Sequence, residues 1–415
     1  MLGVVIEVPT KKLVKSKNEK NDEFYTQFSE IQREINAYIE YNPNVFKDKI
    51  ILLPCDDPEW SNFTKFFAQN FERYGLKKLI STSYSIKNKE EKYNVSYQLS
   101  LFETESPIFD KKKSRENGKI FVLDRDKNKS GKIDIDDLEW NYLDGDGDFR
   151  SDEVKKLRDE ADIIITNPPF SLFRQFVDWI MEADKEFIIM GNKNAISYKE
   201  IFPYLMNNKM WVGASPLNGG RWMIMPDGIN VQSKAAKKNE FGQTLVNIAG
   251  VCWFTNVEHG KRHQPLQLMT MDDNRKFSKH DKIKKIGYLK YDNFDAIDVP
   301  FVDSIPLDYK GIMGVPITFM DKYNPDQFTI LALGNSRDNF TPNKNYINPK
   351  KILKNGKIVS GGAINCVLAI NVKEKPDDIY YISENSDYLI APYARIIIEF
   401  KEVNDENNIE DWFNS

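Results

Sequence analysis

Residues Ile163 to Phe173 read "IIITNPPFSLF". Three isoleucines and a threonine form the apolar run of a buried strand. Two consecutive prolines must end that strand, because proline has no N–H group to donate to a neighbouring strand. A helix-like pattern follows at once in "SLFRQFVDWIMEA". The sequence therefore predicts a strand, a fixed turn at Asn167 to Phe170, and then a helix.

Alternating strand and helix patterns on both sides of this turn predict an α/β sheet. The apolar run 50–53 precedes a helical pattern of phenylalanines, and further strands are predicted at 77–84 and 185–192. We expect Asp56 or Asp57 to cap the helix that follows the first strand. Strands that alternate with helices indicate a parallel sheet with helices on both faces.

The pattern changes after about Leu217, where short aromatic strands are separated by polar turns. Examples are "GRWMIMP", "GVCWFTNV" and "DYLIAPYARIIIEF". These strands indicate a mixed, β-rich second half. At about 150 residues per domain, a chain of 415 residues is expected to form two or three domains.

Composition excludes several classes of protein. No stretch approaches the roughly 18 apolar residues of a membrane span, and the chain does not begin with a signal-peptide pattern, so we expect a soluble, cytoplasmic protein. The three cysteines and three histidines show no metal-binding spacing. We therefore predict no metal site and no disulfide framework.

Positive charge is concentrated in two places, although the net charge is −4. Residues 261–290 contain nine Lys or Arg residues against three Asp, and the first twenty residues contain five lysines. Such patches suit phosphate contacts, and we expect Lys282, Lys284 and Lys285 to contact phosphates. A solvated, lysine-rich surface is the alternative for each patch.

The turn Asn167–Phe170 carries groups suited to one kind of chemistry. In open α/β sheets, ligands bind beyond the carboxyl ends of the strands. The exocyclic amine of a base is a poor nucleophile, since its lone pair is delocalised into the ring. The Asn167 oxygen and a backbone carbonyl at Pro168 would accept its hydrogens and free the lone pair, while Phe170 stacks on the base. We therefore predict attack by a planar amine on an electrophilic methyl; the alternative is a loop that merely ends a strand.

Long stretches of the chain resemble the EcoRI-type adenine-specific modification methylases, a group of S-adenosylmethionine-dependent enzymes with an Asn/Asp-Pro-Pro-aromatic turn. Their order along the chain makes the resemblance far more specific than the tetrapeptide alone. The matching stretches are "NDEFYTQFSEI" (21–31), "CDDPEWSNF" (55–63), "LDGDGDFRSDEV" (143–154), "ITNPPFSLFRQFV" (165–177), "IIMGNKNAISYKEIFP" (188–203) and "MGVPITFMDKYNPDQF" (313–328).

The resemblance implies methyl transfer from S-adenosylmethionine to N6 of an adenine that leaves the stack of double-stranded DNA. The residues that match the catalytic turn are Asn167, Pro168, Pro169 and Phe170. The residues expected at the cofactor are Asp22, Phe24, Tyr25, Thr26, Asp56, Asp57, Asp146 and Asp148. Lys193 and Asn194, in another matched stretch, are expected to contact DNA.

The cofactor side departs from the broader methyltransferase pattern. The usual Gly-x-Gly turn is absent, and "PCDDPEW" (54–60) stands in its place. The strand at 77–84 also lacks the acidic residue that commonly holds the ribose hydroxyls. "GDGDFRS" belongs to the resemblance, so Asp146 or Asp148 is expected to face the active site.

Three other motifs suggest different chemistry. Pro54-Cys55 is similar to the nucleophile element of cytosine-C5 methylases, but no Glu-Asn-Val element accompanies it. Residues 126–137 fit an EF-hand-like calcium loop, with an acidic surface loop as the alternative, since the preceding "GKIFVL" looks extended. Pro376-Asp377 and Glu399–Lys401 loosely fit a metal-dependent nuclease motif.

We therefore predict a Rossmann-like methyltransferase domain over 21–260, a basic arm over 1–20, and a β-rich DNA target-recognition region over 261–415. The enzyme is expected to be a monomer that uses direct displacement without a metal. It would protect DNA from a separate cognate restriction endonuclease. Two alternatives stay open: a methyltransferase for RNA or protein glutamine, and a non-catalytic DNA- or calcium-binding protein.

Overall fold

The computed structural model describes residues 25–57, 61–88, 101–225, 236–335 and 340–401. The predicted basic arm 1–20 lies outside these ranges. Contacts divide the chain into two units, each made of two segments. The first unit is Met1–Lys193 with Val212–Gly260, and the second is Asn194–Trp211 with Lys261–Ser415. Within the described ranges, no helix is long and apolar enough to span a membrane.

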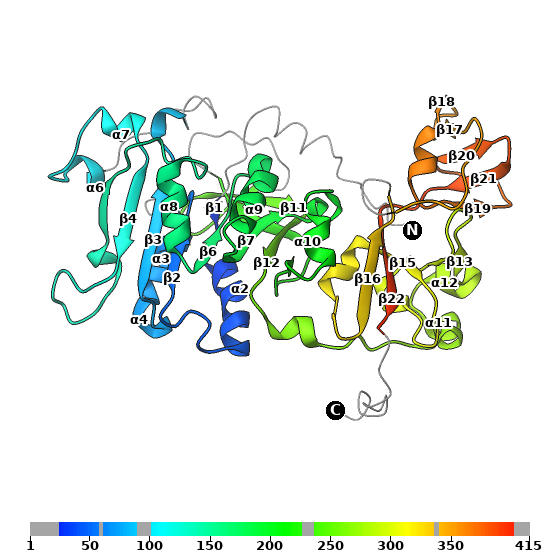
Figure 1. Ribbon diagram of the computed structural model, residues 1–415, viewed down its shortest axis with the longest axis horizontal. Helices are drawn as coiled ribbons and strands as arrows, with labels where there is room; N and C mark the ends of the chain where they lie inside the picture. Colours follow the sequence, from blue (N-terminus) through cyan, green and yellow to red (C-terminus); the bar gives the residue numbers. More distant parts are fainter. Residues whose placement is uncertain (1–24, 58–60, 89–100, 226–235, 336–339, 402–415) are drawn as a thin grey trace. The chain divides into compact units, whose positions relative to one another are not determined.

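An eight-stranded mixed sheet forms the larger layer (Figure 1). Its centre is parallel, because β2 pairs with β3 and β6, and β6 pairs with β7, all in parallel register. Antiparallel partners extend both sides: β4 and β5 beyond β3, and β12 beyond β7. In order across the sheet the strands are β5 (Glu139–Tyr142), β4 (Lys119–Leu123), β3 (Lys78–Ser83), β2 (Ile50–Leu53), β6 (Ile163–Thr166), β7 (Glu186–Asn192), β12 (Val251–Thr255) and β8 (Trp211–Val212).

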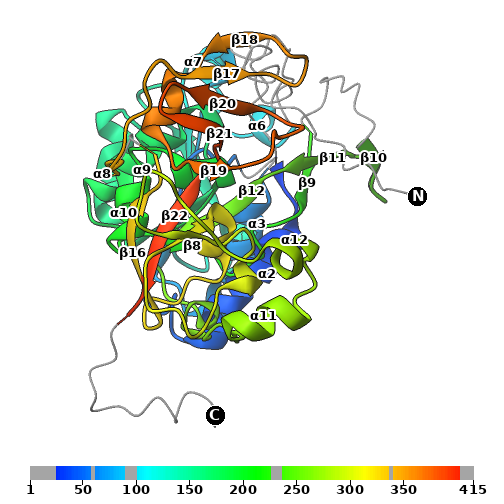
Figure 2. The ribbon, with the colours of Figure 1, turned by 90° about the vertical axis from the view of Figure 1, so that its right-hand side faces the viewer.

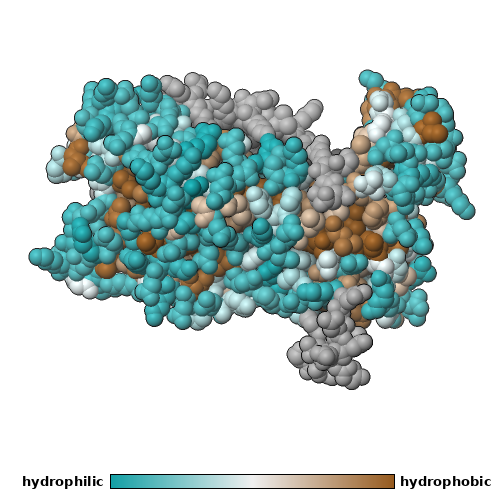
Figure 3. Space-filling view, viewed as in Figure 1, coloured by the Kyte–Doolittle hydropathy of each residue, from teal (hydrophilic) through white to brown (hydrophobic). Residues whose placement is uncertain are grey.

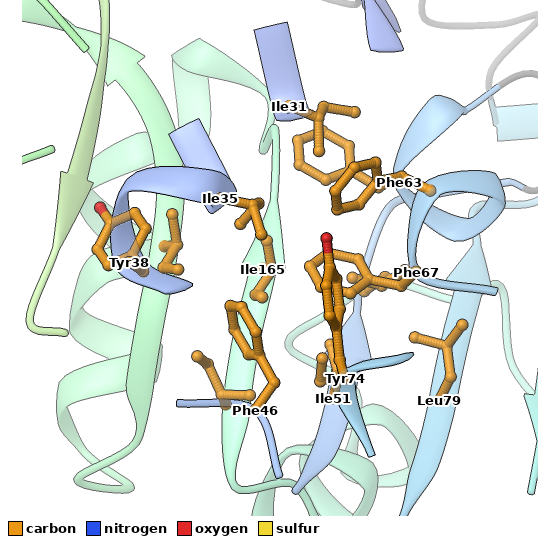
Figure 4. Packing of buried hydrophobic residues seen from close by; sticks show 14 of the residues in the cluster. Ile31, Ile35, Tyr38, Phe46, Ile51, Phe63, Phe67, Tyr74, Leu79 and Ile165 are labelled. Atoms are coloured by element: carbon orange, nitrogen blue, oxygen red, sulfur yellow. The ribbon is translucent and has the colours of Figure 1, made fainter. Parts of the chain in front are cut away.

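Apolar side chains cover both faces of the central strands. On one face, Ile165 and Ile51 pack with helices α2 (Phe28–Tyr41), α3 (Asn62–Gln69) and α4 (Phe71–Tyr74), as Figure 4 shows. Ile164 points to the opposite face, because side chains alternate along a strand, and it is also fully buried. The helices that follow and precede β6 are α9 (Phe173–Met181) and α8 (Asp152–Glu160), and α8 contacts β2. The predicted α/β architecture is confirmed, but the sheet is mixed: only β3, β2, β6 and β7 are parallel, whereas β4, β5 and β12 pair antiparallel.

The cap of α3 differs from the sequence prediction. We expected Asp56 or Asp57 at this position, but the helix begins after Ser61, whose side chain accepts a hydrogen bond from Phe63 N at 3.2 Å. Serine is a strong N-cap because its oxygen satisfies an N–H group that the first helical turn leaves unpaired. Asp56 is thereby released from capping and lies buried near the sheet edge.

The first unit carries a second, antiparallel sheet in the order β1-β9-β11-β10. Its strands are β1 (Tyr25–Thr26), β9 (Gly220–Ile224), β10 (Ala236–Lys238) and β11 (Thr244–Ala249). Short helices α6 (Leu101–Thr104) and α7 (Lys113–Glu116) precede β4. β1 thus joins an amino-terminal segment to residues some 200 positions later, through pairs Tyr25–Ile224 and Thr26–Met223.

The second unit contains two five-stranded sheets (Figure 2). The first has the strands β13 (Leu289–Lys290), β14 (Ile297–Asp298), β15 (Met313–Pro316), β22 (Arg395–Phe400) and β16 (Phe328–Leu333). The other has β18 (Ile358–Ser360), β17 (Lys350–Ile352), β20 (Tyr380–Ser383), β21 (Ser386–Ile390) and β19 (Ile370–Val372). The helices of the second unit are α10 (Phe202–Met206), α11 (Met271–Phe277) and α12 (Asp281–Ile286).

Helix α10 belongs to the second unit although its sequence lies inside the first. It contacts β16, and its own apolar residues Phe202 and Leu205 are fully buried. Arg262 stacks over the Trp211 ring at 3.8 Å and donates to Asn208 Oδ1 at 2.7 Å. The segment 194–211 is therefore fixed by residues that follow position 260.

A buried ion pair links the strands of the first of these sheets. Arg395 Nε donates to Asp298 Oδ1 at 2.8 Å, and Asp298 is 2% exposed. The Tyr291 hydroxyl donates to the same oxygen at 2.8 Å. Burial raises the pKa of Tyr291 well above its ordinary value, so this hydroxyl stays a donor. A Cβ at Gly314 would meet the Tyr291 hydroxyl at 2.2 Å, so only glycine fits there.

We predict that Arg395→Met destabilises the second unit by about 3–5 kcal/mol, because it leaves the Asp298 carboxylate buried without its cation. Lys279→Met is the matched control, since Lys279 pairs with Asp303 at 2.7 Å on the surface of the same unit. Exposed pairs contribute about 0–1 kcal/mol. Urea unfolding of both variants measures the difference, and equal losses would contradict the role given to the buried pair.

Candidate active site

The turn Asn167–Phe170 begins where the central strand β6 ends. Pro169 is extended, with φ −55° and ψ 123°, and its carbonyl accepts from Leu172 N at 2.9 Å. A short 3-10 helix, Phe170–Leu172, then leads into α9. Asn167 is half-buried, and the half-buried Phe170 packs partly against the main core. The proline pair thus fixes the position of Asn167 and Phe170 at the strand end.

Hydrogen bonds join this turn to the one that follows β2. Thr166 Oγ1 lies 2.6 Å from both Asp56 Oδ2 and the Pro54 carbonyl oxygen. Asp56 is 4% exposed, and its other carboxylate oxygen accepts from Ser61 Oγ at 2.6 Å. The residue before Asn167 and the cap of α3 are therefore held by one buried carboxylate.

The amino-terminal strand β1 reaches the same edge of the sheet. Asn62 Nδ2, at the start of α3, donates to the Thr26 carbonyl at 2.8 Å. The Thr26 hydroxyl lies 3.1 Å from Met190 Sδ in β7, and Thr26 is 2% exposed. Tyr25 and Thr26 are thus brought beside the ends of β2 and β7. Asp22 and Phe24 lie outside the described residues.

A glycine-rich loop delivers Asp146 to the carboxyl end of β3. Ser85 N donates to the Asp146 carbonyl and Asn88 Nδ2 donates to Asp146 Oδ2, both at 2.8 Å. Gly147 has φ +80°, and a Cβ there would lie 2.2 Å from the Ser83 carbonyl oxygen. Only glycine permits this close approach. A carboxylate that β3 lacks in its own sequence is therefore supplied by a loop from residues 144–148.

Asp148 is turned towards a cation instead. Arg150 Nε and Nη2 donate to its two carboxylate oxygens at 2.8 and 2.6 Å. This hydrogen-bonded partner raises the pKa of Arg150. Burial, followed by the nearby charges of Asp146 and Asp148, raises the pKa of Tyr84. The loop carries the carboxylates of Asp146 and Asp148, and Arg150 already neutralises the charge of Asp148.

The turn after β2 holds two further features. Cys55 adopts a left-handed conformation with φ +70°, which a residue with a Cβ rarely takes. Strained positions of this kind cluster at binding sites. Asp57, two residues further, is buried at 8% exposure, and its carbonyl accepts from Ser61 N at 2.6 Å. A left-handed residue and a buried carboxylate thus follow β2 at the place where the sequence lacks a Gly-x-Gly element.

Lys193 and Asn194 follow β7 directly, at the start of the 3-10 helix Lys193–Ser197. Lys193 N donates to the Gly250 carbonyl at 2.7 Å. The boundary between the two units falls between these two residues. They stand at the carboxyl end of a central strand, as the turn after β6 does.

Carboxylates neutralise more of the positive charge of residues 261–290 than the count of charged residues in that segment suggested. Lys284 and Lys285 on α12 lie 3.4 and 3.6 Å from the Asp281 carboxylate, and they lower its pKa. Lys261 pairs with Asp321, which lies outside the segment, at 2.8 Å. Counting charge along the sequence could not include such a distant partner.

The EF-hand-like loop is closed by its own hydrogen bonds. Asp126 accepts from Ser130 N and Gly131 N, and Asp137 accepts from Lys127 N and Asn128 N. Ile133 and Ile135, within the loop, pack against the main core. Among the described residues, no group of three or more His, Cys, Asp or Glu side chains could hold a metal ion.

Sequence reasoning missed the residues that join the segments. The sequence predictions treated Thr166 as the end of an apolar strand, and they placed Ser61 and Asn62 within the helix that Asp56 or Asp57 would cap. Thr166 bonds Asp56 across 110 positions and Asn62 bonds Thr26 across 36 positions, whereas Ser61 bonds Asp56 only five positions away. A buried hydroxyl directly before the Asn-Pro-Pro turn was the one local signal available.

Comparison with known proteins extends over nearly the whole chain. The model of the family "Adenine-specific methyltransferase EcoRI" matches residues 12–401. That range includes the turn Asn167–Phe170 and the segments that meet it. No solved structure matches the chain.

Three curated relatives carry the names of Type II methyltransferases. M.EcoRI of Escherichia coli is 39% identical over 321 residues, which cover 77% of this chain and 88% of the relative. M.MgeORF184P of Mycoplasma genitalium is 34% identical, and M.MpnI of Mycoplasma pneumoniae is 33% identical. Both alignments cover 76% of this chain and 84% of the relative. With this coverage and identity, and with the match of the family model, the chain belongs to the EcoRI family of adenine-specific methyltransferases.

Proposed function

We propose that this enzyme methylates N6 of adenine within a specific sequence of double-stranded DNA. The observation that carries the proposal is the turn Asn167–Phe170 at the end of a central strand, beside the ends of β2, β3 and β7. Family membership supplies the adenine, and the names of the relatives support a Type II, restriction-modification role. Family membership does not favour an RNA or protein-glutamine substrate, or a non-catalytic protein.

In the proposed reaction, the target adenine leaves the duplex and enters this turn. The Asn167 side-chain oxygen and the Pro168 carbonyl accept the two amine hydrogens, which leaves the nitrogen lone pair available. Pro169 keeps the backbone extended at this point. The Phe170 ring stacks on the base. Catalysis then depends on positioning and on polar groups aimed at the amine.

S-adenosylmethionine, when bound, supplies an electrophilic sulfonium methyl for direct displacement. Its ribose hydroxyls and ammonium group call for acceptors, and the strand ends provide buried or half-buried carboxylates in Asp57 and Asp146. We assign Asp146 to the ribose side, because it lies at the end of β3. Asp22, Phe24, Tyr25 and Thr26 are assigned to the methionine side, and Asp148 shapes the loop through Arg150.

Asp56 has a different role in this proposal. Both of its carboxylate oxygens already accept hydrogen bonds from Ser61 and Thr166. It is therefore a positioning residue, which keeps the catalytic turn and the start of α3 at a fixed separation. Its contact with the cofactor would come from the backbone of the turn.

The second unit is proposed to read the DNA sequence. Lys282, Lys284 and Lys285 on α12, together with Lys193 and Asn194 after β7, are proposed DNA contacts. A Rossmann-like first unit would then hold the cofactor and the flipped base. The enzyme is proposed to act as a cytoplasmic monomer, without a metal, and to protect DNA from a separate endonuclease.

The experiment that tests this function exposes unmethylated genomic DNA to the purified protein and S-adenosylmethionine, and then detects modified bases by sequencing. Methylated adenines in one short sequence support the proposal and reveal the target site. Labelled RNA and a glutamine peptide serve as parallel substrates. Transfer to either of these, with none to DNA, would overturn the proposal.

We predict that Asn167→Ala lowers turnover by roughly 10²–10³-fold, the loss found when one preorganised hydrogen-bonding group is removed from an active site. Cofactor affinity should be unchanged, because the side chain acts on the amine. Asn167→Asp keeps an acceptor oxygen and is expected to retain more turnover than the Ala variant. Single-turnover kinetics and calorimetry measure the two effects; near-normal turnover in a folded Ala variant would exclude the role.

We predict that Phe170→Ala weakens capture of the flipped base by about 1–3 kcal/mol, the contribution of one stacked base. Phe170→Tyr keeps the ring and is the matched control. A duplex with 2-aminopurine at the target position brightens when the base unstacks, which gives the readout. The assignment fails if the Ala variant gives the same signal and kinetics as the wild type, provided that its melting temperature shows a folded protein.

We predict that Asp146→Asn weakens cofactor binding by roughly 10- to 100-fold, since a hydrogen bond to a charged group contributes about 1.5–3 kcal/mol. Asp144→Asn is the control, because Asp144 is an exposed carboxylate in the same loop. Calorimetric titration with S-adenosylmethionine compares the two. Equal affinity for both variants would remove Asp146 from the cofactor site.

A further inference from the structure

The segment from Phe340 to Lys373 has an unusual charge distribution. Its 34 residues contain six lysines and no Asp or Glu, whereas 62 of the 415 residues in the whole chain are acidic. An even distribution would place about five acidic residues there. The segment therefore carries a local charge of about +6 in a chain whose net charge is −4.

Most of these lysines lie on the hairpin formed by β17 and β18, which we call the lysine hairpin (residues 350–360). Its strands pair Lys350 with Ser360 and Ile352 with Ile358. The turn is well defined: Leu353 N donates to the Lys357 carbonyl, and Gly356 adopts φ +77°. β18 lies at the edge of its sheet, so one side of the hairpin has no neighbouring strand among the residues that the structure describes.

The charges of the lysine hairpin are largely unneutralised. Lys350 and Lys357 form no ion pair with any residue in the described part of the chain. Lys354 approaches Asp378 at 3.3 Å, but both side chains are about two-thirds exposed. An exposed pair of this kind is weak and is readily exchanged for another anion. Lys351 lies over the Tyr381 ring, 5.6 Å from its centre.

An apolar side chain lies beside these charges. Ile358, next to Lys357, is 58% exposed on the edge strand. In Figure 3 the region of this sheet shows hydrophobic atoms among hydrophilic ones. Because β17 also pairs with β20, the hairpin forms the outer two strands of a five-stranded sheet, and its turn and edge strand present the cations and the exposed aliphatic residue. The major groove of DNA admits two β-strands, so this edge is the part of the sheet that suits a DNA groove.

We propose that the lysine hairpin is a DNA-contacting ribbon, in which Lys350 and Lys357 bind phosphates and thereby position the enzyme on the duplex. This inference rests on the proposed function, and it names a contact surface separate from the lysines of α12. Lys284 and Lys285 share the Asp281 carboxylate, whereas the lysines of the hairpin face no acidic residue within their own segment.

A different reading gives these lysines a protective role. Lysines on an exposed edge strand prevent two sheets from pairing edge to edge. That reading predicts that neutralising them promotes self-association and leaves DNA affinity unchanged. The two readings therefore differ in a measurable way.

The test compares two charge-matched double variants. The hairpin variant is Lys350→Gln with Lys357→Gln, and the control is Lys373→Gln with Lys375→Gln, exposed lysines that flank Glu374 in the loop directly after β19. Dissociation constants for target and unrelated duplexes are measured from 50 to 200 mM salt. Each lost phosphate contact should lower the salt slope by about 0.9, so the hairpin variant should lose about 1.8.

We expect the hairpin variant to bind both duplexes more weakly than the wild type does. Because its salt slope is lower by about 1.8, a fourfold rise in salt should reduce its affinity by a factor about 12 times smaller than the factor for the wild type. The control should match the wild type. Turnover at saturating DNA should be unchanged in both. An unchanged slope, or an equal loss in the control, would overturn the proposal, as would self-association by light scattering without a change in affinity.

Methyl transfer by the wild type is measured in the same preparation. Active wild-type enzyme with an unaffected hairpin variant would refute the hairpin alone. A wild type that neither binds nor methylates DNA would refute the proposed function, and the hairpin inference with it.

Discussion

One buried carboxylate fixes the geometry on which the site depends. Asp56 receives hydrogen bonds from Thr166, directly before the turn Asn167–Phe170, and from Ser61, the cap of α3. Hydrogen bonds to a charged group contribute about 1.5–3 kcal/mol each, and more is lost if a buried charge is left unpaired. Because α3 in turn holds Thr26 through Asn62, the positions of three separate segments follow from this single side chain.

The remaining parts of the site reach the sheet edge by close backbone approach. The loop at Gly147 comes against the Ser83 carbonyl, where a larger residue would collide. This approach supplies Asp146 at a strand end whose own sequence has no acid. The absence of both a glycine-rich turn and an acidic strand end is thus balanced by a strained turn at Cys55 and by a carboxylate that arrives from another loop.

Local sequence patterns predicted the strands and helices, whereas contacts between residues far apart in the sequence determined how the strands pair and which side chains meet. The apolar runs of β2, β6 and β7 marked the parallel centre, since burial on both faces leaves an unbroken hydrophobic stretch. β12 could not be assigned to the same sheet, because antiparallel pairing with β7 depends on residues 60 positions apart. The turn Asn167–Phe170 was visible as a motif, whereas Ser61 as a cap and Asp321 as the partner of Lys261 became evident only in three dimensions.

Each of the two units is built from two separate segments of the chain, which limits how the units can be exchanged between related enzymes. The chain passes from one unit to the other three times, after residues 193, 211 and 260. Exchange of the carboxy-terminal region alone would leave α10 and Trp211 without β16 and Arg262. Exchange of the second unit by recombination must therefore include the inner segment 194–211. Under the proposed function, a new DNA specificity would require that whole exchange or point substitutions within the existing fold.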